Sequence, residues 1–306
     1  MRTADEVADA IRRLAVRGAP LIGVAAAYGV ALELARDPAP DTLERACQTL
    51  RGARPTAANL AYAVDRVRRA VAAAPDLAAE TALNEARTIE REEHQASDAI
   101  AAHGADYLHG TRTILTHCNT GALAAPGRGT ALAVVAELAT RGELKRAIAT
   151  EARPLLQGAR LTAYELARMG ISYELIVDAA AAGLIASGEV DAVIVGCDRV
   201  AANGDVANKV GTYSLALAAR AAQIPFVVAG PSSSIDLECP SGSDVVIEER
   251  GADEVRSASG ALLTLPDAPC RNPAFDLTPA PLVSALVTER GVLSPVTADA
   301  ILRFRA

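Results

Sequence analysis

The sequence predicts an α/β protein in which an N-terminal helical domain is followed by an α/β domain built on a parallel sheet. Three observations support this fold class. The chain has 306 residues and is 51% hydrophobic, enough for about two packed domains. Its first part shows only helical spacing of apolar residues, whereas apolar, β-branched runs alternate with helical segments from Thr111 onward. We therefore expect a helical domain over residues 1–110 and the α/β domain over residues 111–306.

Helical patterns follow one another through the N-terminal domain. Thr3 and Glu6 form a capping-box pattern ahead of apolar residues at helical spacing. Starts, ends and apolar periodicity predict four more helices: residues 21–32, a helix that begins at Asp41, residues 60–71 with Pro75 as the stop, and a longer charged helix over residues 78–103.

The rest of the chain alternates between strand and helix patterns. Strands are expected over residues 113–117, 146–150, 171–177, 190–195, 226–229 and 244–247. Helices are expected over residues 130–141, 161–169, 179–186 and 208–222. Strands separated by helices of this length form βαβ units and a parallel sheet. A last helix is expected to open at Thr278, with Pro279 at its first position.

Composition excludes several classes of protein. The net charge is −7 and arginine is not concentrated on any polar run, which argues against a nucleic-acid partner. The five cysteines are widely spaced without a CxxC pair, so neither a metal site nor a disulfide framework is expected. The longest apolar stretch, residues 19–32, is too short to cross a bilayer, and the chain start does not resemble a signal peptide. We expect a cytoplasmic protein with no membrane partner.

Polar residues follow the predicted strands at the ends where open α/β sheets bind ligands. They occupy residues 117–121, 150–158, 196–209 and 230–234. Lys209 lies in one of these segments and is one of only two lysines among the 30 basic residues of the chain. It could be a solvated surface lysine, or a compact ammonium retained for a phosphate or hydroxyl. His117 could be a base, although a strand histidine is more often a core group.

The main candidates each have a structural alternative. Cys118 could be a buried structural thiol, but its position at a strand end near a helix start can make a thiol reactive. Asp198 could be a turn or cap residue, or a carboxyl whose raised pKa suits an acid. The sequence Arg17-Gly18-Ala19 could form a plain turn, or an anion site at a helix start.

Five segments of the chain resemble motifs of the methylthioribose-1-phosphate isomerases: VRGAPLIGVAAAYGVAL, THCNTGALA, ARPLLQGARLTAYEL, GCDRVAANGDVANKVGTYSLA and NPAFDLTP. They occur in the family's order over residues 16–279. The wider superfamily also holds ribose-1,5-bisphosphate isomerases and the regulatory subunits of translation initiation factor 2B. The resemblance implies a helical domain followed by a Rossmann-like domain, a homodimer, and neither a metal nor an organic cofactor.

The resemblance also implies roles for the matching residues. Cys118 in THCNTGALA matches the family's catalytic cysteine, and Asp198 in GCDRVAANGD matches its catalytic acid. The matches to its substrate-binding residues are Arg17, Gly18, Ala19, Arg54, Gln157, Asn208 and Lys209. The implied reaction converts 5-methylthioribose 1-phosphate into 5-methylthioribulose 1-phosphate in methionine salvage, a route of amino-acid biosynthesis.

These residue types suit that reaction. A phosphate blocks the anomeric position of the sugar, so an acid must help to open the ring before hydrogen moves from C2 to C1. Asp198 suits the acid, Cys118 suits a proton carrier or an electrostatic partner, and Arg17 and Arg54 suit the phosphate. Two alternatives remain. One is an isomerase of 5-deoxyribose 1-phosphate or ribose 1,5-bisphosphate, and the other is a non-catalytic regulatory subunit that senses a sugar phosphate.

Overall fold

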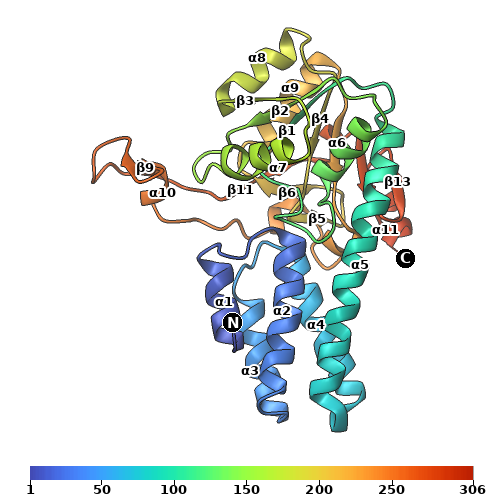
Figure 1. Cartoon of the computed structure of the whole chain (residues 1–306), viewed down its shortest axis with the longest axis vertical. Coiled ribbons are helices and arrows are strands. Elements are labelled where there is room, and N and C mark those ends of the chain that lie inside the picture. Colours follow the sequence, from blue (N-terminus) through green and yellow to red (C-terminus); the bar gives the residue numbers. More distant parts are fainter. Residues whose placement is uncertain (306) are drawn as a thin grey trace.

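The computed structural model describes residues 1–305 and confirms an α/β protein whose helical part comes first (Figure 1). The N-terminal helices are α1 (Ala4–Arg12), α2 (Ala19–Leu34), α3 (Pro40–Arg51), α4 (Ala58–Ala73), the 3₁₀ turn η1 (Pro75–Leu77) and α5 (Ala78–Tyr107). The Thr3 hydroxyl accepts a hydrogen bond from the Glu6 amide at 3.1 Å, as the capping pattern predicts.

α2 is the central helix of this bundle and packs against α1, α3, α4 and α5. It is apolar on all sides, and its small residues allow close helix contacts: a Cβ on Gly23 would lie only 2.8 Å from the Asn59 carbonyl oxygen. Ile22 of α2 and side chains of neighbouring helices such as Ile11 and Leu60 are fully buried in this bundle, and each stabilises it by roughly 1.5–3 kcal/mol.

A seven-stranded sheet forms the centre of the second part, in the order β13-β12-β7-β4-β1-β2-β3. Its strands are β1 (Thr113–Thr116), β2 (Arg146–Thr150), β3 (Tyr173–Ile176), β4 (Ala192–Val195), β7 (Phe226–Ala229), β12 (Ala285–Thr288) and β13 (Gly291–Leu293). All neighbours are parallel except β12 and β13.

Helices cover both faces of the sheet, which explains why its central strands are apolar along their whole length. Ile114 packs into the core on the α5 side, and the next residue, Leu115, packs into the core on the opposite side. The covering elements are α6 (Ala131–Thr140), the π-helical turn η2 (Gly158–Thr162), α7 (Ala163–Arg168), the 3₁₀ turn η3 (Asp178–Ala180), α8 (Ala181–Ala186), α9 (Thr212–Ala222) and the C-terminal α11 (Ala298–Arg305).

α5 joins the two parts of the molecule. Its Ile89 belongs to the core of the helical bundle, whereas its Ile100 belongs to the core beneath the sheet. Figure 1 shows α5 running from the bundle along the side of the α/β part. None of the helices within residues 1–305 is long and apolar enough to cross a membrane.

A second, smaller sheet has the strand order β11-β6-β5-β8. Its strands are β5 (Arg199–Ala201), β6 (Val206–Lys209), β8 (Ile235–Asp236) and β11 (Phe275–Thr278), and the nearby turns are η4 (Ser232–Ser234), η5 (Gly242–Asp244) and η6 (Ala280–Leu282). β6 pairs antiparallel with β11, so that Lys209 lies opposite Phe275. Between β8 and β11 the chain forms an arm with α10 (Asp253–Arg256), β9 (Ser257–Ala258) and β10 (Ala261–Leu262), which projects from the body in Figure 1.

Three sequence-based expectations are wrong. Residues 244–247 form no strand, because the Ser241 and Asp244 side chains cap the 3₁₀ turn η5 there. No long helix opens at Thr278, which ends β11; Pro279 precedes only η6, and the chain then continues as β12. The helix expected from residue 208 begins only at Thr212, because residues up to Lys209 are paired in the small sheet. In each case tertiary pairing or local capping outweighs the apolar pattern.

Candidate active site

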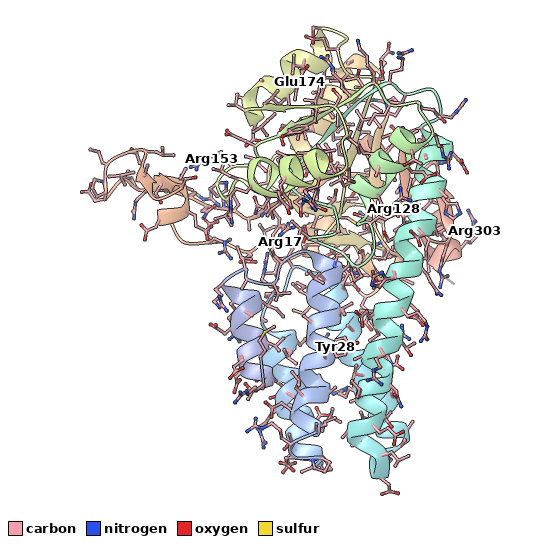
Figure 2. The ribbon with its side chains drawn as sticks, in the orientation of Figure 1. Arg17, Tyr28, Arg128, Arg153, Glu174 and Arg303 are labelled. Atoms are coloured by element: carbon pink, nitrogen blue, oxygen red, sulfur yellow. The ribbon has the colours of Figure 1, made fainter. Side chains whose placement is uncertain are left out.

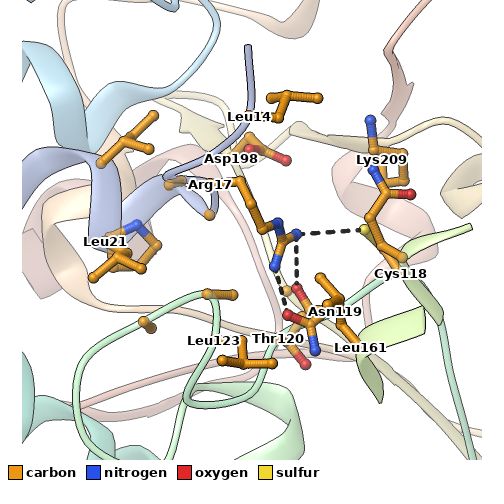
Figure 3. Close-up of a pocket in the computed structure, with 18 of the residues that line it drawn as sticks. Leu14, Arg17, Leu21, Cys118, Asn119, Thr120, Leu123, Leu161, Asp198 and Lys209 are labelled. Carbon is orange, nitrogen blue, oxygen red and sulfur yellow. Dashed lines mark hydrogen bonds between the residues drawn. The ribbon is translucent and has the colours of Figure 1, made fainter. Parts of the chain in front are cut away.

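A cavity of about 640 Å³ opens at the carboxyl ends of β1 and β4, where the loops after these strands meet the start of α2. All nine residues to which the family resemblance assigns a role line this one cavity: Arg17, Gly18, Ala19, Arg54, Cys118, Gln157, Asp198, Asn208 and Lys209. Figure 3 shows that Arg17, Cys118, Asp198 and Lys209, which come from four different segments, face a common space. Parallel-sheet topology explains the meeting, since the carboxyl ends of neighbouring strands share an edge.

Cys118 lies in the loop directly after β1 and has a left-handed backbone (φ 62°). A residue with a side chain adopts this conformation only when its surroundings hold it there. The thiol is buried, and its Sγ lies 4.0 Å from a guanidinium nitrogen of Arg17.

Arg17 is held by the loop that it faces. Its guanidinium donates to the side-chain oxygen of Asn119 and, at 3.4 Å, to the Asn119 carbonyl oxygen (dashed lines in Figure 3). The next residue, Gly18, has φ 98°, and a Cβ there would lie 2.1 Å from the Ala124 carbonyl oxygen. Only glycine fits this position, and Ala19 then begins α2 at the cavity wall.

Asp198 follows β4 in a loop fixed at its backbone. Its carbonyl oxygen accepts a hydrogen bond from the first amide of α4, that of Ala58, and its own amide donates to Ala207; both distances are 3.0 Å. Enclosure away from water raises the pKa of the Asp198 carboxyl. The charges of Lys209 and of the two arginines nearby oppose that rise. A carboxyl in this environment retains its proton more readily than an exposed one.

Lys209 is buried beside the ring of Phe275. Its ammonium donates to the Ala274 carbonyl oxygen at 2.7 Å and lies 4.6 Å from the ring centroid. Burial lowers the pKa of Lys209, whereas the negative charges of Cys118 and Asp198 raise it. The Arg54 guanidinium lies 5.6 Å from the centroid of the same ring, so two cations contact this ring.

Gln157 and Asn208 supply neutral polar groups. Gln157 is buried at the cavity wall, and among the described residues its side-chain oxygen has no hydrogen-bond partner. Such an orphan acceptor suits the hydroxyl of a ligand. Asn208 donates to the Thr212 hydroxyl at 3.0 Å. Apolar side chains also line the cavity: Leu14, Leu21, Leu123, Leu155 and Leu161.

His117 does not line the cavity. It is buried with both ring nitrogens in contact with polar partners, the Thr150 hydroxyl at 2.6 Å and the Val210 carbonyl oxygen at 2.9 Å. Burial lowers its pKa, which favours the neutral ring. His117 is therefore a core residue with both ring nitrogens in polar contacts, and not a base at the cavity.

Several residues at the cavity carry no strong sequence signal. Asn119, Thr162 and Glu165 hold the loop of Cys118, and Glu248 pairs with Arg54 at 2.9 Å. Glu165 sits on a short helix within an ordinary amphipathic pattern, and its burial becomes visible only in the folded chain. Over residues 1–305, no group of three or more His, Cys, Asp or Glu side chains is arranged to hold a metal ion.

Comparison with known proteins gives one consistent family. A model described as the initiation factor 2 subunit family matches residues 15–295. The methylthioribose-1-phosphate isomerase of Anaeromyxobacter sp. (strain K) is 52% identical over 96% of this chain and 85% of its own length. That of Alcanivorax borkumensis is 49% identical over 94% and 84%, respectively.

Solved structures agree with this result. The 5-methylthioribose 1-phosphate isomerase of Pyrococcus horikoshii OT3 has a TM-score of 0.87 and 42% identity, covering 99% of this chain and 87% of that one. The translation initiation factor eIF-2B subunit delta of A. fulgidus has a TM-score of 0.81 and 38% identity, covering 99% and 92%.

Proposed function

The chain belongs to the methylthioribose-1-phosphate isomerases, within the initiation factor 2 subunit family, and we propose that Cys118 and Asp198 perform that chemistry in the cavity described above. The enzyme is an aldose–ketose isomerase of methionine salvage, which converts 5-methylthioribose 1-phosphate into 5-methylthioribulose 1-phosphate. One observation supports the site proposal above others: the Cys118 thiol and the Asp198 carboxyl, whose pKa is raised, line the same cavity as several cationic side chains, among them Arg17 and Lys209.

The polar side chains that line the cavity suit the phosphate and the hydroxyls of the substrate. Arg17 and Arg54 offer guanidinium donors, and the turn at Gly18 and Ala19 brings backbone amides to the same wall. We assign the free acceptor of Gln157 and the groups of Asn208 and Lys209 to the sugar hydroxyls and the phosphate.

Ring opening is the step that needs an acid. Protonated Asp198 gives its proton to the ring oxygen as the bond from that oxygen to C1 breaks. Hydrogen then moves from C2 to C1, and the proton of the C2 hydroxyl is released to the Asp198 carboxylate as the C2 carbonyl forms. This returns the acid to its starting state. Cys118 lies beside Arg17 and acts either as the carrier of hydrogen or as an electrostatic partner in the second step.

Two substitutions test these roles. Cys118→Ala and Asp198→Asn are each expected to lower kcat by roughly 10²- to 10⁴-fold with little change in thermal stability. Cys270→Ala and Asp267→Asn are the matched controls, since neither residue lines the cavity. If both active-site variants kept the wild-type kcat, the proposed mechanism would be wrong.

Substrate preference at C5 is tested by comparing kcat/KM on three sugars: methylthioribose 1-phosphate, 5-deoxyribose 1-phosphate and ribose 1,5-bisphosphate. The leucine side chains at the cavity suit an apolar C5 substituent better than a second phosphate. We expect the methylthio sugar to be preferred over the bisphosphate by at least tenfold, roughly the discrimination that one apolar group provides. Preference for the bisphosphate would contradict this assignment.

We also propose that the enzyme is a cytoplasmic homodimer with domains over residues 1–110 and 111–306. α7 and the edge strand β3 contact each other, and exposed apolar side chains lie on them or directly after them: Tyr164 and Met169 at α7, Leu175 and Val177 at β3. A second copy could cover them. Light scattering after gel filtration should give twice the chain mass of 31.5 kDa, and Leu175→Lys should lower it. A wild-type enzyme that is monomeric at micromolar concentration would refute the dimer.

A further inference from the structure

The segment after β2 does more than line the cavity. Its π-helical turn η2 contains Thr162, and α7 contains Glu165; both side chains are buried, at 1% and 8% exposure. Both contact the loop that contains Cys118.

Thr162 holds the left-handed turn at Cys118. Its hydroxyl donates to the Cys118 carbonyl oxygen at 2.6 Å. Because the hydroxyl proton is used in that bond, the Thr162 oxygen accepts a hydrogen bond from the side-chain amide nitrogen of Asn119, at 3.3 Å. One side chain therefore binds two consecutive residues of a turn whose φ of 62° is unfavourable for cysteine.

Glu165 binds the same loop through both carboxylate oxygens. One accepts from the Asn119 side-chain amide at 2.7 Å, and the other accepts from the Ala122 backbone amide, also at 2.7 Å. The loop closes tightly around this carboxylate, since a Cβ on Gly121 would lie 2.2 Å from one of its oxygens. Glycine at that position is therefore part of the same arrangement.

These contacts set the direction of Arg17. An ionised carboxylate only accepts hydrogen bonds, so the Asn119 amide nitrogen must face Glu165. The Asn119 side-chain oxygen then faces the opposite way and accepts from Arg17. The other terminal nitrogen of this guanidinium is the one 4.0 Å from the Cys118 sulfur.

We propose that Glu165, together with Thr162, is a positioning residue: it orients Asn119 so that Arg17 stays directed at the Cys118 sulfur. The catalytic meaning of this arrangement rests on the role proposed above for Cys118. The arrangement itself is testable without turnover, because the rate at which a thiol is alkylated depends on the cation and the polar groups held beside its sulfur.

The test uses Glu165→Gln, which keeps the size of the side chain but leaves one acceptor oxygen for two donors. Alkylation of Cys118 by iodoacetamide is followed by mass spectrometry of the peptide that contains it, without substrate, from pH 6 to pH 10. We expect the alkylation rate at pH 7 to fall at least fivefold. We expect kcat to fall by roughly 10-fold or more, since small misplacements of catalytic groups are costly, with a smaller change in KM.

Three further variants separate positioning from mere support of the fold. Thr162→Val should shift the alkylation profile in the same direction as Glu165→Gln, and Thr162→Ser, which retains the hydroxyl, should restore it. Glu174→Gln is the control, because Glu174 lies on β3, far from Arg17 in Figure 2. It should match the wild type.

A folded Glu165→Gln enzyme with the wild-type alkylation profile and kcat would overturn the proposal. If that variant does not fold, the Thr162 pair decides: equal profiles for the valine and serine variants would overturn it, and rescue by serine alone would support it. Failure of the isomerase assignment would appear separately, as absent turnover in the wild type with the alkylation shifts intact.

Discussion

Glu93 provides a sharp test of how buried charge affects the stability of this fold. It lies on α5, where its carboxylate accepts from the Ser233 hydroxyl at 3.0 Å. That hydroxyl in turn accepts from the Asn59 amide at 2.7 Å, so α5, α4 and the turn η4 meet at this point. Burial raises the pKa of Glu93 from 4.5 to about 7. Glu289 and Glu92 add to the rise, whereas the Ser233 hydrogen bond and Arg66 oppose it.

The sign of the pH dependence follows from this direction. The folded-state pKa of Glu93 lies above its unfolded value, so its contribution to stability is fully present below pH 4.5 and is lost as the pH rises through about 7. Each pKa unit corresponds to about 1.4 kcal/mol. The rise of the Glu93 pKa from 4.5 to about 7 therefore lowers the free energy of unfolding at pH 8 by about 3 kcal/mol.

Glu93→Gln removes the titration and keeps an acceptor for Ser233. At pH 8 the variant should be more stable than the wild type by about 3 kcal/mol, and at pH 5 the two should be nearly equal. Urea unfolding followed by circular dichroism at both pH values measures this. Other groups that titrate in this range contribute equally to both proteins, so their contributions cancel when the two free energies of unfolding are subtracted. Asp276 is one such group, because burial raises its pKa to about 6.

The matched control is Glu80→Gln, an exposed position on the same helix. It should change stability by no more than about 0.5 kcal/mol at either pH. If Glu93→Gln altered stability by the same amount at pH 5 and pH 8, the buried charge would not be the cause and the reasoning would fail.

Three other predictions concern the cavity. Gly18→Ala should lower stability by about 2 kcal/mol or more and raise KM, because its Cβ would meet the Ala124 carbonyl group; urea unfolding and kinetics with wild-type values would contradict this. Lys209→Arg should lower kcat/KM by roughly tenfold or more, because a guanidinium does not match the contacts of a buried ammonium, and near-normal kinetics would refute that need. Burial raises the pKa of Asp198, so kcat/KM should fall as the pH rises through the pKa of this carboxyl, and the Asp198→Asn variant should lack this fall. A kcat/KM that instead rose over the same pH range would exclude the protonated carboxyl as the active form.

The order of elements was largely predictable from the sequence. Helical periodicity in the first part and the βαβ alternation that follows are local patterns, and strands such as β2 and β7 occur where those patterns indicate. The candidate residues that follow strands, such as Cys118 and Asp198, could also be identified from the sequence. Polar residues after an apolar strand indicate the ligand-binding edge of a parallel sheet. Placing Cys118 and Asp198 in one cavity required only that rule.

The errors share a different cause. A helix was expected to open at Thr278, but the chain forms only the short turn η6 there and continues into β12, whose ALVT segment is buried beside β7, a neighbour far away in the chain. The small sheet was missed for the same reason: β6 and β11 are short and stable only as a pair. Local pattern carries no information about which distant segment will supply the missing hydrogen bonds.

The sequence by itself determined the fold class, the helical start, the parallel sheet and the residues at its ligand-binding edge, because each depends on neighbours along the chain. The tertiary structure alone decided that Phe275 lies beside Lys209 and Arg54. It also decided that Glu165 accepts a hydrogen bond from Asn119 and that the partly buried Glu93 lies where α5, α4 and the turn η4 meet. Burial and direction of a side chain depend on what packs around it, and those contacts form only when the whole chain folds.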